Sequence, residues 1–119
     1  MQMSNAEILE KIASLEGRDD LLFSTPDNPY ESIDIYAKVR HGCLTITDSE
    51  RDHGPDGGWS HGTLAFDEEN TVKAIALLCE SNSDPFQALQ DMLDYSKRTR
   101  TFRDACTERG IQFEMTLAF

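Results

Sequence analysis

Apolar and polar residues alternate most regularly between residues 32 and 47. Apolar side chains occupy every second position from residue 33 to 39, a period of two that predicts a half-buried strand. His41-Gly42 follows as a two-residue turn, in which glycine readily adopts the positive φ that such turns need. Pairing across this turn places the apolar positions of both runs on the same face. The turn and the pattern therefore agree on one register for a hairpin over residues 32–47.

Apolar residues with helical spacing flank this hairpin in three places. Ser4 and Glu7 form a capping box ahead of the first apolar face. Asp67 is placed to cap the second face, and Asp84-Pro85 supplies an N-cap and a first helical residue for the third. The spacing predicts helices at about residues 4–16, 67–80 and 84–109.

The third predicted helix contains a change of face near its middle. Its early apolar residues project from one side and its later ones from another, as shown by Phe86, Leu89 and Leu93 against Tyr95, Phe102 and Cys106. Either one long helix is buried by different neighbours at its two ends, or the helix breaks near residues 95–99. A single helix over 84–109 is the preferred prediction.

The C-terminal residues alternate again and predict a strand over 111–119 that docks in the sheet beside the hairpin. Residues 63–66 predict a further short strand, and the apolar run 21–23 is compatible with another.

At 119 residues the chain has room for one hydrophobic core. The predicted fold is a single α+β domain over residues 1–119, in which an antiparallel sheet packs with three helices.

Residues 48–62 show no periodicity and predict an acidic, glycine-rich loop of about fifteen residues. This loop contains His53, His61 and the single tryptophan, Trp59. Carboxylates at alternate positions from Asp48 onward resemble the start of a calcium-binding loop. The match fails because His53 occupies the position that needs glycine and Trp59 the position that needs a bidentate glutamate. An EF-hand site is therefore excluded.

The net charge of -11 arises from 22 acidic and 11 basic residues. Such a surface repels phosphate backbones, which disfavours direct nucleic-acid binding and favours a protein partner with a basic surface. The leading hypothesis is a small acidic protein-binding module, such as a phage or mobile-element inhibitor or an immunity-type protein, that contacts the nucleic-acid-binding surface of its target. The predicted partner-binding residues are Asp48, Glu50, Asp52, Asp56, Trp59, Asp67, Glu68 and Glu69. For Trp59 the alternative, which is slightly preferred, is that it anchors the loop in the core.

Residues 97–119 carry five basic and three acidic side chains, a local net charge of +2 on an acidic chain. Cations near the end of a helix complement its dipole and pair with carboxylates, and this structural interpretation is preferred. The functional alternative is that these cations anchor an acidic partner, including a second copy of the chain in a homodimer. The basic patch comprises Arg98, Arg100 and Arg103.

The alternative function is a metal-assisted hydrolase or nuclease, in which His53, His61 and nearby carboxylates bind a metal ion. The spacing of these histidines matches no recognised ligand motif. The sequence also contains no P-loop, no dinucleotide-binding glycine fingerprint, no HExxH and no nucleophile elbow. A binding protein is therefore preferred over an enzyme, and no catalytic residue or cofactor is predicted.

The three cysteines, Cys43, Cys79 and Cys106, stand far apart in apolar-patterned segments and are interpreted as buried thiols. Their odd number and the lack of a signal-peptide pattern predict a cytoplasmic protein with reduced thiols. No apolar run approaches the length of a membrane span, so no membrane association is expected.

A last pattern joins a Thr-Pro pair, two alternating runs and the glycine between them. The residues are Thr25-Pro26, Ile33-Asp34-Ile35-Tyr36, Gly42 and Leu44-Thr45-Ile46-Thr47-Asp48. They resemble the opening hairpin of a family of uncharacterised prokaryotic and phage domains. The resemblance ends after Asp48, where Ser49-Glu50 stands in place of the glycine that this family tends to have. It implies no activity.

Overall fold

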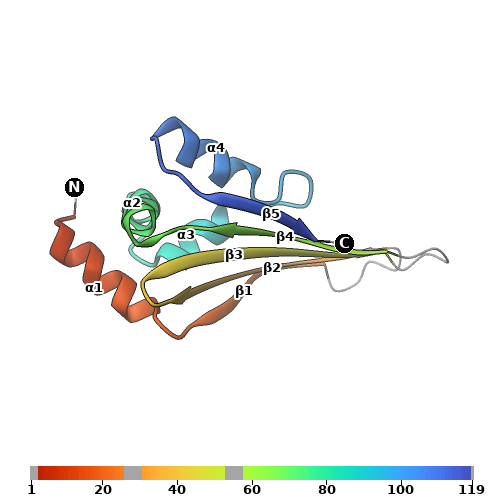
Figure 1. The fold of residues 1–119 in the computed structure, drawn as a ribbon, viewed down its shortest axis with the longest axis horizontal. Helices are drawn as coiled ribbons and strands as arrows, with labels where there is room; N and C mark the ends of the chain where they lie inside the picture. Colours follow the sequence, from red (N-terminus) through yellow and green to blue (C-terminus); the bar gives the residue numbers. More distant parts are fainter. Residues whose placement is uncertain (1–2, 26–30, 53–57, 119) are drawn as a thin grey trace.

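The computed structural model describes residues 3–25, 31–52 and 58–118. This part of the chain folds into a five-stranded antiparallel sheet with the strand order β1-β2-β3-β4-β5, together with four helices (Figure 1). The α+β class predicted from the sequence is therefore confirmed. The strands are β1 (Asp19–Ser24), β2 (Glu31–Arg40), β3 (Cys43–Asp52), β4 (Trp59–Ala65) and β5 (Glu114–Ala118). The helices are α1 (Asn5–Leu15), α2 (Glu68–Cys79), α3 (Pro85–Asp91) and α4 (Arg100–Glu108).

The predicted hairpin is present as β2 and β3, with the predicted register. Arg40 pairs with Cys43, and the ladder then continues without interruption to Asp52. The turn residues His41 and Gly42 have φ values of 56° and 74°. Two successive positive φ values are what the tight turns of hairpins with two-residue loops require, because they match the twist of the paired strands.

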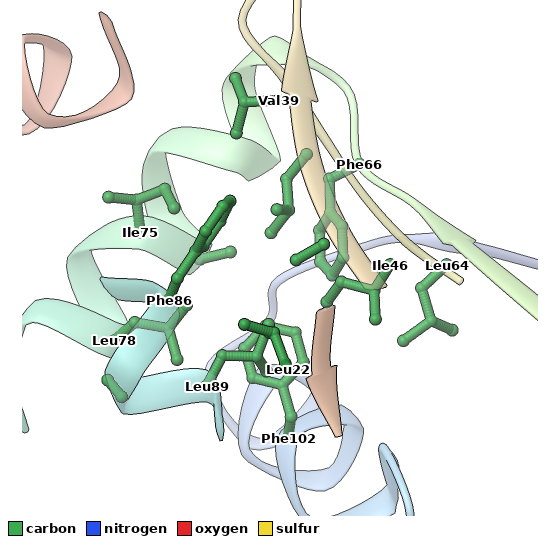
Figure 2. Packing of buried hydrophobic residues seen from close by; sticks show 14 of the residues in the cluster. Leu22, Val39, Ile46, Leu64, Phe66, Ile75, Leu78, Phe86, Leu89 and Phe102 are labelled. Carbon is green, nitrogen blue, oxygen red and sulfur yellow. The ribbon is translucent and has the colours of Figure 1, made fainter. Parts of the chain in front are cut away.

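One face of the sheet carries the core. Figure 1 shows α2, α3 and α4 on the same side of the strands, while α1 lies at one end of the sheet and contacts α2. Alternate residues of the central strands are fully buried beneath these helices, as Figure 2 shows for Val39 and Ile46. The largest buried side chains are Phe86 from α3 and Phe102 from α4. None of the described helices is long and apolar enough to cross a membrane.

The opposite face of the sheet is polar. Its central row runs across all five strands and contains Leu21, Tyr36, Thr47, Thr63 and Thr116. Leu21 and Tyr36 are exposed, and the two central threonines are half-buried. Threonine fits this position because its branched side chain packs on a pleated surface while its hydroxyl remains hydrated.

The prediction of one long loop at residues 48–62 is wrong. β3 continues through Asp52 and β4 begins at Trp59, which leaves residues 53–57 outside the described part. The alternation of β3 also continues here, but carboxylates take over the core-facing positions that Leu44 and Ile46 hold earlier in the strand. Without apolar residues in these positions, the sequence pattern no longer resembles a strand.

The prediction of a single helix over 84–109 is also wrong. The chain forms α3 and α4, separated by turns at residues 92–99 in which Arg98 has a φ of 55°. A residue in the left-handed region cannot continue an α-helix. The break coincides with the change of apolar face, because each short helix can then turn its own apolar side toward the sheet. Four helices are therefore present where three were predicted.

The C-terminal strand is shorter than predicted and lies at the edge of the sheet. β5 pairs with β4, so that β4 separates it from the β2–β3 hairpin. Ile111 is buried ahead of the strand and Phe113 packs against the core, with its ring 5.4 Å from that of Phe66. Within the strand, by contrast, Met115 and Leu117 are 52% and 67% exposed.

Candidate functional site

The predicted partner-binding carboxylates fall into two groups along the sheet. β3 contains ten residues, which at ~3.3 Å per residue span about 30 Å. Asp67, Glu68 and Glu69 lie near the beginning of β3, because Phe66 pairs through its backbone with Leu44. Asp48 and Asp52 lie in the second half of the strand. The predicted residues therefore form two separate candidate sites instead of one continuous surface.

The first site, which we call the acidic end, surrounds the tip of the β2–β3 hairpin. The Glu16 carboxylate accepts hydrogen bonds from the backbone amides of His41, at 2.5 Å, and Gly42, at 3.2 Å. The Glu68 side chain reaches the same turn, since a Cβ atom on Gly42 would lie 3.6 Å from its Cγ. Glu16, Asp67 and Glu68 are exposed here, and their charges reach Cys43 beside the turn. The exposed Glu69 follows in the first turn of α2, and we include it in the acidic end.

Local backbone chemistry keeps two of these carboxylates charged. Hydrogen bonds from the amides of His41 and Gly42 lower the pKa of Glu16. A hydrogen bond from the Asn70 amide, at 2.8 Å, lowers the pKa of Asp67, which caps α2. Neither role removes the negative charge from the surface, so both residues contribute to the field around the hairpin tip.

Cys43 lies inside this field and is not an activated thiol. Burial raises its pKa, and the nearby charges of Glu68, Asp67 and Glu16 raise it further. A thiol with a raised pKa is protonated at neutral pH and is a weak nucleophile. Cys106 is buried within the core, where desolvation raises its pKa to about 12. Neither of these cysteines is suited to nucleophilic catalysis.

The second site is a pocket of about 170 Å³ between the far half of the sheet and the turns that precede α4. Its apolar lining comes from three neighbouring strands and consists of Ile46, Leu64, Met115 and Leu117. Four charged side chains border the same space, those of Asp48, Glu50, Arg98 and Arg103. We refer to it as the Asp48 pocket.

Asp48 has an unusual environment for a carboxylate. It occupies a core-facing position two residues beyond the fully buried Ile46, and its Oδ1 atom is buried with no hydrogen-bond partner among the described residues. Burial raises the pKa of Asp48, although the nearby charges of Arg98 and Arg103 partly oppose that shift. Buried polar groups almost always have a hydrogen-bond partner, so an exception needs an explanation.

Glu50 and Arg98 form an ion pair across the mouth of the pocket. The Arg98 guanidinium donates to both carboxylate oxygens of Glu50, at 2.9 and 3.3 Å. This bidentate pair joins β3 to the turns between α3 and α4, although the two residues are 48 positions apart in the sequence. Arg98 itself has a positive φ, which is unfavourable for a residue with a side chain, and its amide donates to the Asp94 carbonyl oxygen at 2.9 Å.

Arg103 borders the pocket without a carboxylate partner in the described part of the chain. Its Nε donates to Thr99 Oγ1 at 3.1 Å, and its Nη1 lies 3.7 Å from Met115 Sδ. Arg100 is exposed at the start of α4 and lines a different surface. The three arginines of the predicted basic patch therefore have different surroundings, and Arg98 is largely neutralised by Glu50.

Gly62 determines how much space lies beside Asp48. It is the direct β4 partner of Asp48 and, on its other side, of Leu117 in β5. A Cβ atom at this position would approach Leu117 Cδ2 to 3.2 Å. Because glycine has no side chain, Leu117 packs over the strand and the space next to Asp48 remains open.

The remaining predicted site residues lie partly outside the described part of the chain. His53 and Asp56 lie outside the described residues. The backbones of Asp52 and Trp59 end β3 and begin β4, and their side chains also lie outside the description. His61 is in β4 and is among the residues that line the Asp48 pocket, although strand alternation places its side chain on the same face as Thr63. No group of three or more potential metal ligands occurs among the described residues.

Comparison with known proteins yields no relatives. No family model matches the chain, and no curated protein or solved structure matches it either. The resemblance of residues 25–48 to a family of uncharacterised domains therefore gains no support. The functional proposals below are based on the two sites just described.

The environment of Asp48 leads to a testable prediction about stability. A pKa raised by burial means that the folded state favours protonated Asp48, so stability is lost as the pH rises through that pKa. We expect Asp48→Asn, which removes the charge, to raise the free energy of unfolding at neutral pH by about 1 kcal/mol. The difference in stability between Asp48→Asn and the wild type should disappear at about pH 3, where the Asp48 side chain of the wild type is protonated and uncharged.

Urea denaturation at both pH values measures this difference. Asp104→Asn, at an exposed position on α4, is the matched control and should leave the stability unchanged at neutral pH. A loss of stability in the Asp48→Asn variant at neutral pH would show that the carboxylate is satisfied within the fold.

Proposed function

We propose that this protein is an acidic binding module that docks on the basic surface of a partner protein. The observation that carries the proposal is the acidic end, where four exposed carboxylates lie at the hairpin tip and the adjoining N-terminus of α2. Asp67, Glu68 and Glu69 were predicted as contact residues from the sequence, and Glu16 joins them. The contact surface that we propose is therefore this end of the molecule.

The charge of the acidic end is only weakly neutralised within the protein. Glu69 lies 3.7 Å from Lys73, whereas the other three carboxylates form no salt bridge within the described residues. Two cations elsewhere are already paired, since Arg98 contacts Glu50 and Arg109 contacts Glu80. A concentrated negative field on a protein with a net charge of -11 steers association toward a basic surface.

The chemistry of the partner follows from the same charge. A large basic surface is the electrostatic signature of a nucleic-acid-binding protein. The acidic end would compete with phosphate groups for that surface, as an inhibitor or an immunity-type protein does. Direct binding of this protein to nucleic acid is disfavoured by the same net charge.

Affinity capture from the native host with three versions of the protein tests this proposal. The baits are the wild type, the double variant E68K/E69K at the acidic end, and the control D104K/E108K, which makes the same change of charge on α4. We expect the wild type and the control to retain a common nucleic-acid-binding protein that E68K/E69K loses. Capture of the same proteins by all three baits, or loss from the control alone, would contradict the proposal.

A further inference from the structure

We propose that the Asp48 pocket binds a small zwitterion, namely a free α-amino acid with an apolar side chain. In this arrangement the Asp48 carboxylate accepts from the ligand ammonium group, and the Arg103 guanidinium donates to the ligand carboxylate. The apolar lining receives the ligand side chain. This site is separate from the acidic end and does not depend on the function proposed for it.

The charges around the pocket leave one carboxylate and one guanidinium available. Glu50 and Arg98 neutralise each other through two hydrogen bonds. Asp48 and Arg103 border the same small cavity but form no salt bridge with each other. A ligand with an ammonium and a carboxylate group would pair with both Asp48 and Arg103, whereas a ligand with a single charge would pair with only one of them.

The described protein leaves the Asp48 carboxylate without a full set of hydrogen-bond donors. Its Oδ1 atom is buried and accepts no hydrogen bond from the described protein groups. A half-buried carboxylate with one unsatisfied oxygen reduces the stability of the fold, and such features are often retained where they serve binding. A ligand ammonium supplies three donors together with the compensating positive charge.

Size and lining restrict the ligand further. The cavity of about 170 Å³ is smaller than the ~300–1,000 Å³ of pockets for drug-sized molecules, so a metabolite of amino-acid size is the appropriate class. Ile46 and Leu64 form apolar walls, and Leu117 closes over the glycine beside Asp48. These aliphatic surfaces favour an aliphatic side chain over a polar one.

Titration with leucine, valine and alanine, followed by calorimetry and by amide NMR spectra, tests the proposal. Two analogues of leucine with a single charge separate the contributions of the two ligand charges to binding. Isopentylamine lacks the carboxylate, and isocaproate lacks the ammonium group. Asp48→Asn and Arg103→Gln remove the two protein charges. Asp104→Asn and Arg100→Gln are matched controls at exposed positions of α4.

We expect at least one of the three amino acids to bind and to shift the amide signals of Gly62, Thr99 and Leu117. Removing either charge from the ligand or from the pocket should weaken binding by about tenfold or more, and the control variants should bind as the wild type does. The proposal is overturned if none of the three amino acids binds. It is also overturned if isopentylamine or isocaproate binds as tightly as leucine, or if Asp48→Asn, with a folded spectrum, binds as the wild type does.

Discussion

Replacing Phe102 with alanine is expected to lower the free energy of unfolding by about 3–5 kcal/mol. Phe102 is fully buried and packs against Phe66, with ring centroids 5.9 Å apart (Figure 2). Only Phe102 and Cys106 are buried on α4, so the aromatic ring supplies most of the contact between this helix and the sheet. A loss of this size is a large part of the ~5–15 kcal/mol that stabilises a typical domain.

Urea denaturation of three variants checks the origin of this effect. Phe102→Leu keeps most of the buried volume and should lose less than about 1.5 kcal/mol. Phe113→Ala removes a half-buried ring that also contacts Phe66, and its loss should be clearly smaller than that of Phe102→Ala. If Phe102→Ala unfolded at the same urea concentration as the wild type, α4 would not be packed as described.

The second large effect is expected from Thr71→Val, which exchanges a hydroxyl for a methyl group of similar size. Thr71 is fully buried in α2, and its Oγ1 accepts a hydrogen bond from the Leu44 amide at 2.9 Å. The same hydroxyl lies 3.4 Å from the carbonyl oxygen of Phe66. Valine would leave the Leu44 amide buried without a partner, so we expect a loss of about 1–3 kcal/mol.

Thr71→Ser separates the hydrogen bond from the packing of the methyl group. Serine keeps the hydroxyl and should lose only about 1 kcal/mol, which corresponds to one buried methyl group. Amide hydrogen exchange at Leu44 provides a local readout, because exchange should become faster in Thr71→Val than in Thr71→Ser. Equal stability of the valine variant and the wild type would show that the Leu44 amide is satisfied in another way.

The hairpin could be predicted because its determinants are local. The alternation of β2 and the two-residue turn at His41-Gly42 each specify the same register, and both constraints lie within sixteen residues of sequence. By contrast, the second half of β3 was missed. Asp48 and Glu50 continue the period of two that begins at Leu44, but carboxylates in core-facing positions do not resemble a strand unless the pocket beside them is known.

The sequence contains a sign of the break between α3 and α4, but it does not distinguish a break from one continuous helix. The change of apolar face near Tyr95 indicated either a break or a change of neighbours. The structure contains the break, where Arg98 has a positive φ and its side chain pairs with Glu50, which is 48 positions away. Long-range contacts of this kind cannot be obtained from local periodicity.

The acidic end was predicted only in part, for a similar reason. Asp67, Glu68 and Glu69 are consecutive and stand out in the sequence. Glu16 does not, because it reaches the hairpin turn through an isolated parallel bridge to Val39 that joins the end of α1 to β2. Charge composition predicts that a protein is acidic, whereas the position of its carboxylates depends on how the elements pack.

The most direct test of the proposed function is the salt dependence of binding to the captured partner. We expect the dissociation constant of the wild type to rise with salt concentration, because ions screen the attraction between the acidic end and a basic surface. E68K/E69K should bind more weakly and show a smaller slope, while D104K/E108K should keep the slope of the wild type. An affinity that is independent of salt and is not weakened by E68K/E69K would contradict the proposal that the acidic end is the contact surface.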